Sequence, residues 1–167
     1  MSDRTRRVRH SPVADCVALL PIDPLLVSPD EDLLAVMHRV ADRPQTRLLG
    51  VVDAAGVLIG VLSIVRLAEA VIVRVSPETV LAEITQLDAA ARFGHAIAAK
   101  NVGDVMLAPA SVRPDQTVDE AFRLMHGRHL SGVYVIDEAG RPTGYLDLLE
   151  LTMRYVEALE ADQAEGR

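Results

Sequence analysis

The chain has 167 residues, of which 50% are hydrophobic but only 3% aromatic, and it carries a formal net charge of −7. This length suits one domain or two small halves that share a core, built here from aliphatic side chains. The negative charge disfavours nucleic acid as the main partner, because neutralising phosphates takes concentrated Lys and Arg.

The first eleven residues are basic and contain little that is apolar. The cluster consists of Arg4, Arg6, Arg7 and Arg9. We predict a disordered, solvated tail over 1–11, because nothing apolar there can anchor it to a core. A short arm that touches phosphates is the alternative. The segment lacks the apolar core of a secretory signal.

The cysteine content and the longest apolar stretch both favour a cytoplasmic protein. Cys16 is the only cysteine, so it cannot form an internal disulfide, and we predict a buried apolar thiol. Residues 57–75 are rich in Val, Leu and Ile, but charged residues interrupt them. A membrane span needs about 20 mostly apolar residues, so a strand followed by an amphipathic helix fits better.

One pattern occurs twice in the chain. The aligned pairs are VADCV (13–17) with VGDVM (102–106), VSPDEDLLAVM (27–37) with VRPDQTVDEAF (112–122), and VDAAGVLIGVLS (52–63) with IDEAGRPTGYLD (136–147). In the last pair the aspartate and the two glycines have identical spacing. A duplication of this extent predicts two equivalent halves.

Each copy predicts the order β-α-β-β-α, counting a short extended stretch before the Pro-Asp pair. That pair opens a turn, and Asp30 or Asp115 can begin the first helix. Both helices have an apolar face spaced i, i+3, i+4, i+7. The faces are Leu33, Val36, Met37 and Val40 in the first copy, and Val118, Ala121, Phe122 and Met125 in the second.

Two short strands follow in each copy, joined by the turns DAAG and DEAG. Gly56 and Gly140 can take the positive φ that such turns require. A second helix then begins at Ser63 or Asp147. The predicted parts of the chain are a tail (1–11), a first repeat (12–75), a helical linker (76–101), a second repeat (102–158) and a C-terminal tail (159–167).

Paired units of this order, with the figures GVLSIVR (60–66) and GYLDLLE (144–150), resemble the cystathionine β-synthase (CBS) domain family. The chain resembles a tandem CBS pair, or Bateman module, over about residues 12–158. The resemblance implies an α/β fold in which two repeats pack sheet to sheet with pseudo-two-fold symmetry and form two clefts. It also implies a regulatory module that binds AMP, ADP, ATP or S-adenosylmethionine and often forms homodimers through its helices.

The repeated figure has a chemistry that suits a nucleotide. Gly lets a backbone approach closely, and a hydroxyl at the helix start lies beside N–H groups that favour phosphate. A carboxylate one turn later can accept hydrogen bonds from both ribose hydroxyls. The candidate ligand-binding residues are Gly60, Ser63 and Arg66 in the first copy, Gly144, Asp147 and Glu150 in the second, and Val112 and Tyr134 as contacts to a base.

The two copies depart from this pattern in different ways. Arg66 stands at the ribose position of the first copy, where it cannot accept a hydrogen bond but could reach a phosphate. Asp147 replaces the hydroxyl of the second copy and would repel a phosphate, whereas Glu150 could still bind ribose. We therefore expect phosphate tolerance in the first cleft, and an uncharged or cationic adenosyl ligand, or none, in the second. Helix capping explains Ser63 and Asp147 as well, and Tyr134 has a core-edge explanation.

We predict a cytoplasmic sensor that binds an adenosyl ligand and signals to an unknown effector protein, with a homodimer formed through the CBS helices. No nucleic acid or membrane is expected as a partner. The alternative is a ligand-free structural dimerisation or adaptor module. HGRH (126–129) lacks further ligands for a metal ion, and no catalytic motif is present, so we predict neither a metal site nor an enzyme.

Overall fold

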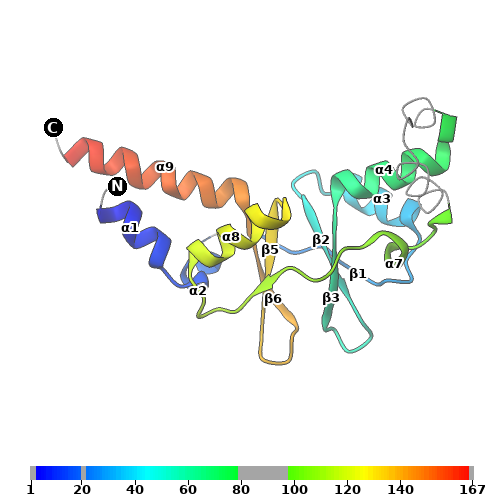
Figure 1. Ribbon diagram of the computed structural model, residues 1–167, viewed down its shortest axis with the longest axis horizontal. Coiled ribbons are helices and arrows are strands. Elements are labelled where there is room, and N and C mark those ends of the chain that lie inside the picture. Colours follow the sequence, from blue (N-terminus) through cyan, green and yellow to red (C-terminus); the bar gives the residue numbers. More distant parts are fainter. Residues whose placement is uncertain (1–2, 20–21, 79–97, 166–167) are drawn as a thin grey trace. The chain divides into compact units, whose positions relative to one another are not determined.

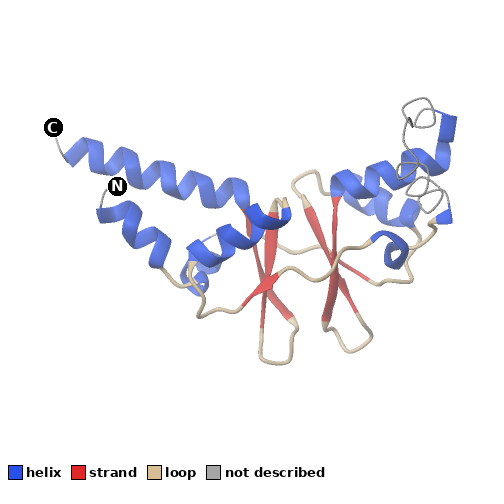
Figure 2. Ribbon diagram, viewed as in Figure 1, coloured by secondary structure: helices blue, strands red, loops and turns tan. Residues whose placement is uncertain are grey.

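The computed structural model describes residues 3–19, 22–78 and 98–165, and it contains two three-stranded sheets with helices packed on them (Figure 1). The first repeat comprises β1 (Leu26–Val27), α3 (Leu33–Ala41), β2 (Leu48–Val52), β3 (Leu58–Ser63) and α4 (Ile64–Val75). The second comprises β4 (Ser111–Val112), α8 (Val118–Arg128), β5 (Gly132–Ile136), β6 (Pro142–Asp147) and α9 (Leu148–Glu165). Both repeats have the predicted order β-α-β-β-α, which confirms the mixed α/β class (Figure 2).

The two sheets have the same strand order. Their orders are β1-β2-β3 and β4-β5-β6, with the first strand of each parallel to the central one. The strands β5 and β6 are antiparallel, and Tyr134 lies opposite Tyr145. Gly56 and Gly140 have φ of 79° and 77°, so both turns use the left-handed conformation that their glycines permit.

The first helix of each repeat begins later than predicted. The N-cap of α3 is Asp32 rather than Asp30, and its carboxylate accepts hydrogen bonds from the backbone of the first turn. The N-cap of α8 is Thr117 rather than Asp115, and with Glu120 it forms a capping box. The earlier aspartates lie in the preceding turn, so a cap at the correct distance from the apolar face determines where each helix starts.

The predicted apolar faces of these helices are buried, except for Met37, which is partly buried, and Phe122. The buried members are Leu33, Val36, Val40, Val118, Ala121 and Met125. Phe122 is instead 39% exposed, and its ring stacks on His126 with a centroid distance of 6.3 Å. Phe122 lies at the margin of its helix face, where a long side chain reaches solvent and a neighbour one turn away.

The chain forms two compact units that do not coincide with the two continuous repeats. One unit consists of Met1–Pro24, Gly56–Leu58 and Ala110–Arg167, and the other of Leu25–Ala55 and Ile59–Pro109. As a result, α2 (Val13–Leu19), which leads the first repeat in the sequence, packs on α8 and β6 of the second. Conversely, α7 (Val102–Val105), which leads the second repeat, packs on α4 of the first.

The same backbone hydrogen bonds hold both exchanged helices. In one unit the bonds run from Val13 N to Gln116 O (2.8 Å), from Ala14 N to Pro114 O (3.0 Å) and from Val118 N to Ser11 O (3.0 Å). In the other unit the equivalent bonds run from Val102 N to Glu31 O (2.9 Å), from Gly103 N to Pro29 O (2.8 Å) and from Leu33 N to Lys100 O (3.0 Å). Val13 and Val102 are both fully buried. The duplication therefore includes the backbone hydrogen bonds by which each leading helix is attached to the opposite repeat.

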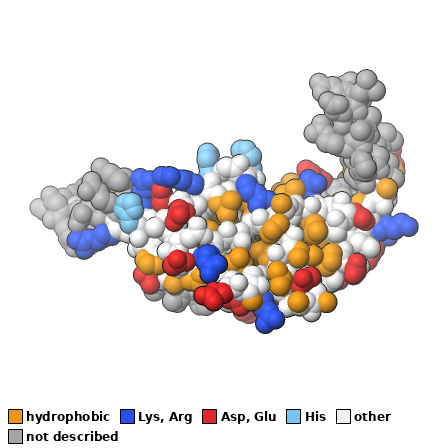
Figure 3. Space-filling view, turned by 60° about the horizontal axis from the view of Figure 1, so that its bottom comes forward, with side chains coloured by type: hydrophobic (Ala, Val, Ile, Leu, Met, Phe, Trp, Pro, Cys, Tyr) orange, Lys and Arg blue, Asp and Glu red, His pale blue; other side chains and the backbone are white. Residues whose placement is uncertain are grey.

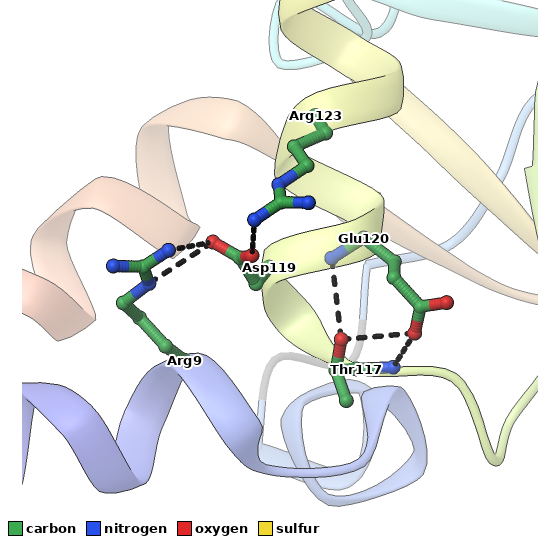
Figure 4. A network of polar contacts seen from close by, with 5 residues as sticks. All are labelled: Arg9, Thr117, Asp119, Glu120 and Arg123. Atoms are coloured by element: carbon green, nitrogen blue, oxygen red, sulfur yellow. Dashed lines mark hydrogen bonds and ion pairs between the residues drawn. The ribbon is translucent and has the colours of Figure 1, made fainter.

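The basic N-terminal segment is not the disordered tail that we predicted. Residues Asp3–His10 form helix α1, which contacts α8 and α9. Arg9 donates to Asp119 Oδ1 from Nε (3.0 Å) and Nη2 (2.7 Å), and Arg123 pairs with Asp119 Oδ2 at 2.7 Å (Figure 4). An ionic anchor thus replaces the apolar one that the segment lacks.

The ends of the remaining predicted segments also differ from the structure. Helix α9 continues to Glu165, through most of the predicted C-terminal tail. The predicted linker helix over 76–101 lies mainly outside the described residues.

On the face shown in Figure 3, basic side chains are interspersed with acidic and apolar ones.

Candidate functional site

The start of α4 brings together three of the residues predicted to bind a ligand. Gly60 lies within β3, Ser63 ends that strand, and Arg66 lies in the first turn of the helix. The Ser63 hydroxyl accepts a hydrogen bond from Arg66 N (3.2 Å), so the predicted helix cap is confirmed. No acidic side chain occupies the first turn of α4. This junction therefore combines a hydroxyl and a cation at the start of a helix.

Gly60 is required by a contact inside the protein. A Cβ on Gly60 would lie 2.7 Å from Met106 Sδ and 2.9 Å from the carbonyl oxygen of Leu107. Leu107 also pairs with Val61 through two backbone hydrogen bonds of 2.8 and 3.0 Å. The close approach that we predicted for this glycine is thus made by the segment that follows α7.

Arg66 reaches from α4 to the end of α7. Its Nε donates a hydrogen bond to the carbonyl oxygen of Val105, the last residue of that helix. The Arg66 side chain is nevertheless exposed, whereas Val105 is buried. The start of α7 is secured separately, because the Asp104 carboxylate accepts from the backbone of Asn101 and Lys100, which lowers the pKa of Asp104.

At the equivalent junction of the second repeat, the polar side chains form hydrogen bonds within the protein. Asp147 is only 3% exposed, and its Oδ1 accepts from Leu149 N (2.8 Å), so it caps α9 as predicted. The Tyr145 hydroxyl donates to Asp147 Oδ2 at 3.3 Å. A Cβ on Gly144 would lie 2.7 Å from Val17 Cγ1. Glu150 lies in the first turn of α9, and its side chain lies outside the described part.

The two candidates for contacts to a base lie inside the second sheet. Val112 is 3% exposed and pairs with Val135, while Tyr134 is fully buried. The Tyr134 ring packs against the Tyr145 ring with a centroid distance of 5.2 Å. Tyr134 is therefore a core residue, more deeply buried than the position at the edge of the core that the sequence suggested. The structure thus brings Gly60, Ser63 and Arg66 together at the β3–α4 junction and Gly144, Asp147 and Glu150 at the β6–α9 junction, whereas Val112 and Tyr134 lie within strands β4 and β5.

The sequence interpretation missed one close contact in this sheet, between Gly132 and the ring of Tyr145. A Cβ on Gly132 would lie 2.2 Å from the Tyr145 hydroxyl oxygen and 2.5 Å from Cζ. The first repeat has Leu48 and Val61 at the aligned positions. A glycine opening a strand in only one copy was the signal for a large side chain lying across it.

The remaining candidate groups are the lone cysteine and the histidines near the end of α8. Cys16 is buried, and burial raises the pKa of its thiol, as expected for an inert core cysteine. Among the residues that the structure describes, no group of three or more His, Cys, Asp or Glu side chains could hold a metal ion. His129, the C-cap of α8, has a left-handed backbone with φ of 53°.

The repeat topology and the sequence of both junctions agree with a family model for the CBS domain, which matches residues 13–73 and 102–157. The chain belongs to the CBS domain family. Its two matched segments make it a tandem CBS pair, as the duplication predicted. A comparison with curated proteins gives no match. No helix in the described ranges of this CBS pair is long and apolar enough to cross a membrane.

Solved CBS proteins share this fold. A CBS domain-containing protein from Thermotoga maritima is 25% identical with a TM-score of 0.68, covering 86% of this chain and 93% of that one. The CBS domain pair of protein MJ0100, in complex with 5′-methylthioadenosine and S-adenosylmethionine, is 17% identical with a TM-score of 0.63, covering 89% and 98%. CBSX2, known from Arabidopsis thaliana, in complex with AMP is 20% identical with a TM-score of 0.61, covering 87% and 96%.

Proposed function

We propose that this CBS pair is a regulatory module that binds an adenosyl ligand and passes the binding event to a partner protein. Support comes from CBS pairs of the same fold whose complexes hold 5′-methylthioadenosine and S-adenosylmethionine, or AMP. In this chain the observation that carries the proposal is the grouping of Ser63 with an exposed Arg66 at the start of α4. A hydroxyl and a guanidinium at a helix start form a favourable environment for a phosphate.

The two junctions favour different ligands. The junction at Ser63 presents a cation and no carboxylate in the first helical turn. The junction at Asp147 presents a buried carboxylate that a phosphate would have to approach. We therefore assign AMP, ADP or ATP to the first junction, and an uncharged or cationic adenosyl ligand, or none, to the second.

Isothermal titration calorimetry with ATP, AMP and S-adenosylmethionine tests this assignment. We expect Arg66→Ala to weaken ATP binding by roughly tenfold or more, because it removes a charge-assisted contact. Glu150→Ala should leave ATP binding unchanged. Arg74→Ala is the matched control, because Arg74 lies on the same helix but pairs with Asp32 at 2.9 Å.

The results separate two kinds of failure. Equal loss of ATP binding in Arg66→Ala and Glu150→Ala would contradict the difference between the junctions. If the wild-type protein binds none of the three ligands, the sensor function itself is wrong. A thermal unfolding series gives an independent check, since a ligand at 100 times its Kd stabilises the folded state by roughly 2.7 kcal/mol.

The second candidate function is a dimerisation or adaptor module, which exposed apolar residues on two helices favour. On α4 these residues are Val65, Ile72 and Val75, and on α9 they are Leu149, Met153, Val156 and Leu159. The α9 residues recur every three or four positions and therefore follow one side of the helix. We propose that these helices form a homodimer interface, which is compatible with ligand sensing.

Sedimentation velocity tests the interface without reference to any ligand. Replacing Met153 and Val156 together by Glu should shift the protein from dimer to monomer, because charge cannot be buried in an apolar contact. Gln163→Glu adds negative charge at an exposed position of the same helix and is the control. A wild-type protein that is monomeric at all concentrations contradicts the interface.

A further inference from the structure

The contact between Arg66 and Val105 links the β3–α4 junction to the segment that leads into the other compact unit. Arg66 Nε donates to the Val105 carbonyl, and residues 106–109 then lead to Ala110, where the chain enters the other compact unit. The same segment is bonded to β3 through Leu107 and lies against Gly60. A change at Arg66 therefore acts directly on the end of α7 and on the chain that follows it.

The contact leaves most of the guanidinium available. Only Nε is used, and within the described ranges Nη1 and Nη2 of Arg66 have no partner. The guanidinium is planar, so fixing Nε also fixes the plane in which the Nη hydrogens point. Arg66 is thus held in one orientation with a fork of donors still free for an oxyanion.

Val105 makes the bond costly to lose. The residue is 7% exposed with Arg66 in place, and the hydrogen bond between the two residues is partly buried. An unsatisfied buried acceptor is unfavourable, and this keeps Arg66 on α7 in the absence of ligand. A lysine carries its three donors on a single nitrogen, so it lacks the planar fork that lets one nitrogen hold the carbonyl while two others face a ligand.

We propose that Arg66 binds the phosphate of the ligand through its Nη groups while it holds Val105 through Nε, so that phosphate binding tightens α7 and the segment 106–109. This inference rests on the proposed function and names its regulation. Only the binding of a phosphorylated ligand changes α7 and the segment that follows it. Coupling is reciprocal, so loosening α7 must weaken phosphate binding by the same factor.

Titration with ATP, adenosine and inorganic tripolyphosphate, combined with hydrogen–deuterium exchange of the peptide covering 102–108, tests the proposal. The wild-type protein should bind ATP roughly tenfold or more tightly than adenosine, and ATP but not adenosine should slow exchange in that peptide. Arg66→Lys keeps the charge, yet it should abolish both differences and speed exchange in the free protein. Arg74→Lys, on the same helix, should change neither.

A second variant tests the coupling from the other side. Val102 is fully buried in the core that holds α7. Val102→Ala should loosen α7 and weaken ATP binding severalfold while adenosine binding stays unchanged. ATP weakened only in proportion to adenosine would overturn the coupling.

Each remaining outcome decides between this inference and the proposed function. If ATP and adenosine bind equally, the role of Arg66 is wrong and the adenosyl sensor stands. If no nucleoside binds but tripolyphosphate does so in an Arg66-dependent way and slows exchange over 102–108, the inference stands and the adenosyl sensor is wrong. If nothing binds, both are wrong.

Discussion

At Gly132 the second sheet has no room for a side chain, because the phenol of Tyr145 lies across the strand. The Tyr145 hydroxyl then reaches the buried carboxylate of Asp147, which caps α9. One missing Cβ thus lets a tyrosine on β6 satisfy a charged group at the start of the next helix. The absence of a side chain at Gly132 and the hydrogen bond between Tyr145 and Asp147 therefore depend on each other.

We expect Gly132→Ala to destabilise the fold by about 1–3 kcal/mol, because the new methyl group overlaps the Tyr145 ring. Adding Tyr145→Val, the residue that the first repeat has at the aligned position, should recover part of the loss. Gly127→Ala is the control: a Cβ there meets nothing within 4 Å, and alanine favours a helix. Urea unfolding measures all three, and a Gly132→Ala variant as stable as wild type would refute this close contact.

Some single positions were predictable from local sequence alone. The caps at Ser63 and Asp147 follow from short polar residues at a strand–helix junction, and both were confirmed. At Gly60 the close approach exists, but it is made by Met106 and Leu107. Nothing in the spacing of the pattern reveals that partner, because it lies some 45 residues away in the chain.

Among whole elements, α1 shows how a very polar segment can be anchored. Asp119 binds Arg9 through one carboxylate oxygen and Arg123 through the other, and the Arg9 hydrogen bond holds the pKa of Asp119 below its usual value (Figure 4). The sequence contained both partners, but 110 positions separate Arg9 from Asp119. Local composition therefore predicted a free tail, whereas a distant carboxylate determines the structure.

We expect Asp119→Asn to release α1 without unfolding the rest of the chain, which limited proteolysis after Arg7 and Arg9 would detect. The ion pair should also depend on pH. Because the folded pKa of Asp119 is lowered, its stabilisation is fully present above the unfolded value of about 3.9 and is lost as pH falls through the folded pKa. Faster cleavage by an acid-active protease in that window for wild type, but no pH dependence for Asp119→Asn, is the expected result. Equal cleavage of both proteins at neutral pH would show that Arg9 does not hold the helix.

At the scale of the whole molecule, the repeats exchange their leading helices. Internal duplication predicted the two sheets, their strand order and their flanking helices, because apolar periodicity reports which face of an element is buried. It does not report which neighbour buries that face. The segments at Val13 and Val102 were recognised as a matched pair in the sequence, but their packing on the opposite repeat follows only from the hydrogen bonds at Gln116 and Glu31.

This exchange predicts that a core mutation in a leading helix acts on the other repeat, not on the repeat to which that helix belongs in the sequence. Val13→Ala, at the start of the first repeat, should destabilise the protein by about 2 kcal/mol and speed hydrogen exchange in α8 and β6. Val102→Ala, at the start of the second repeat, should instead speed exchange in α3 and α4. Both valines are fully buried, so the pair is matched in size and environment. Faster exchange in the repeat that directly follows each mutation, with the other unaffected, would mean that the helices pack where the sequence order alone would place them.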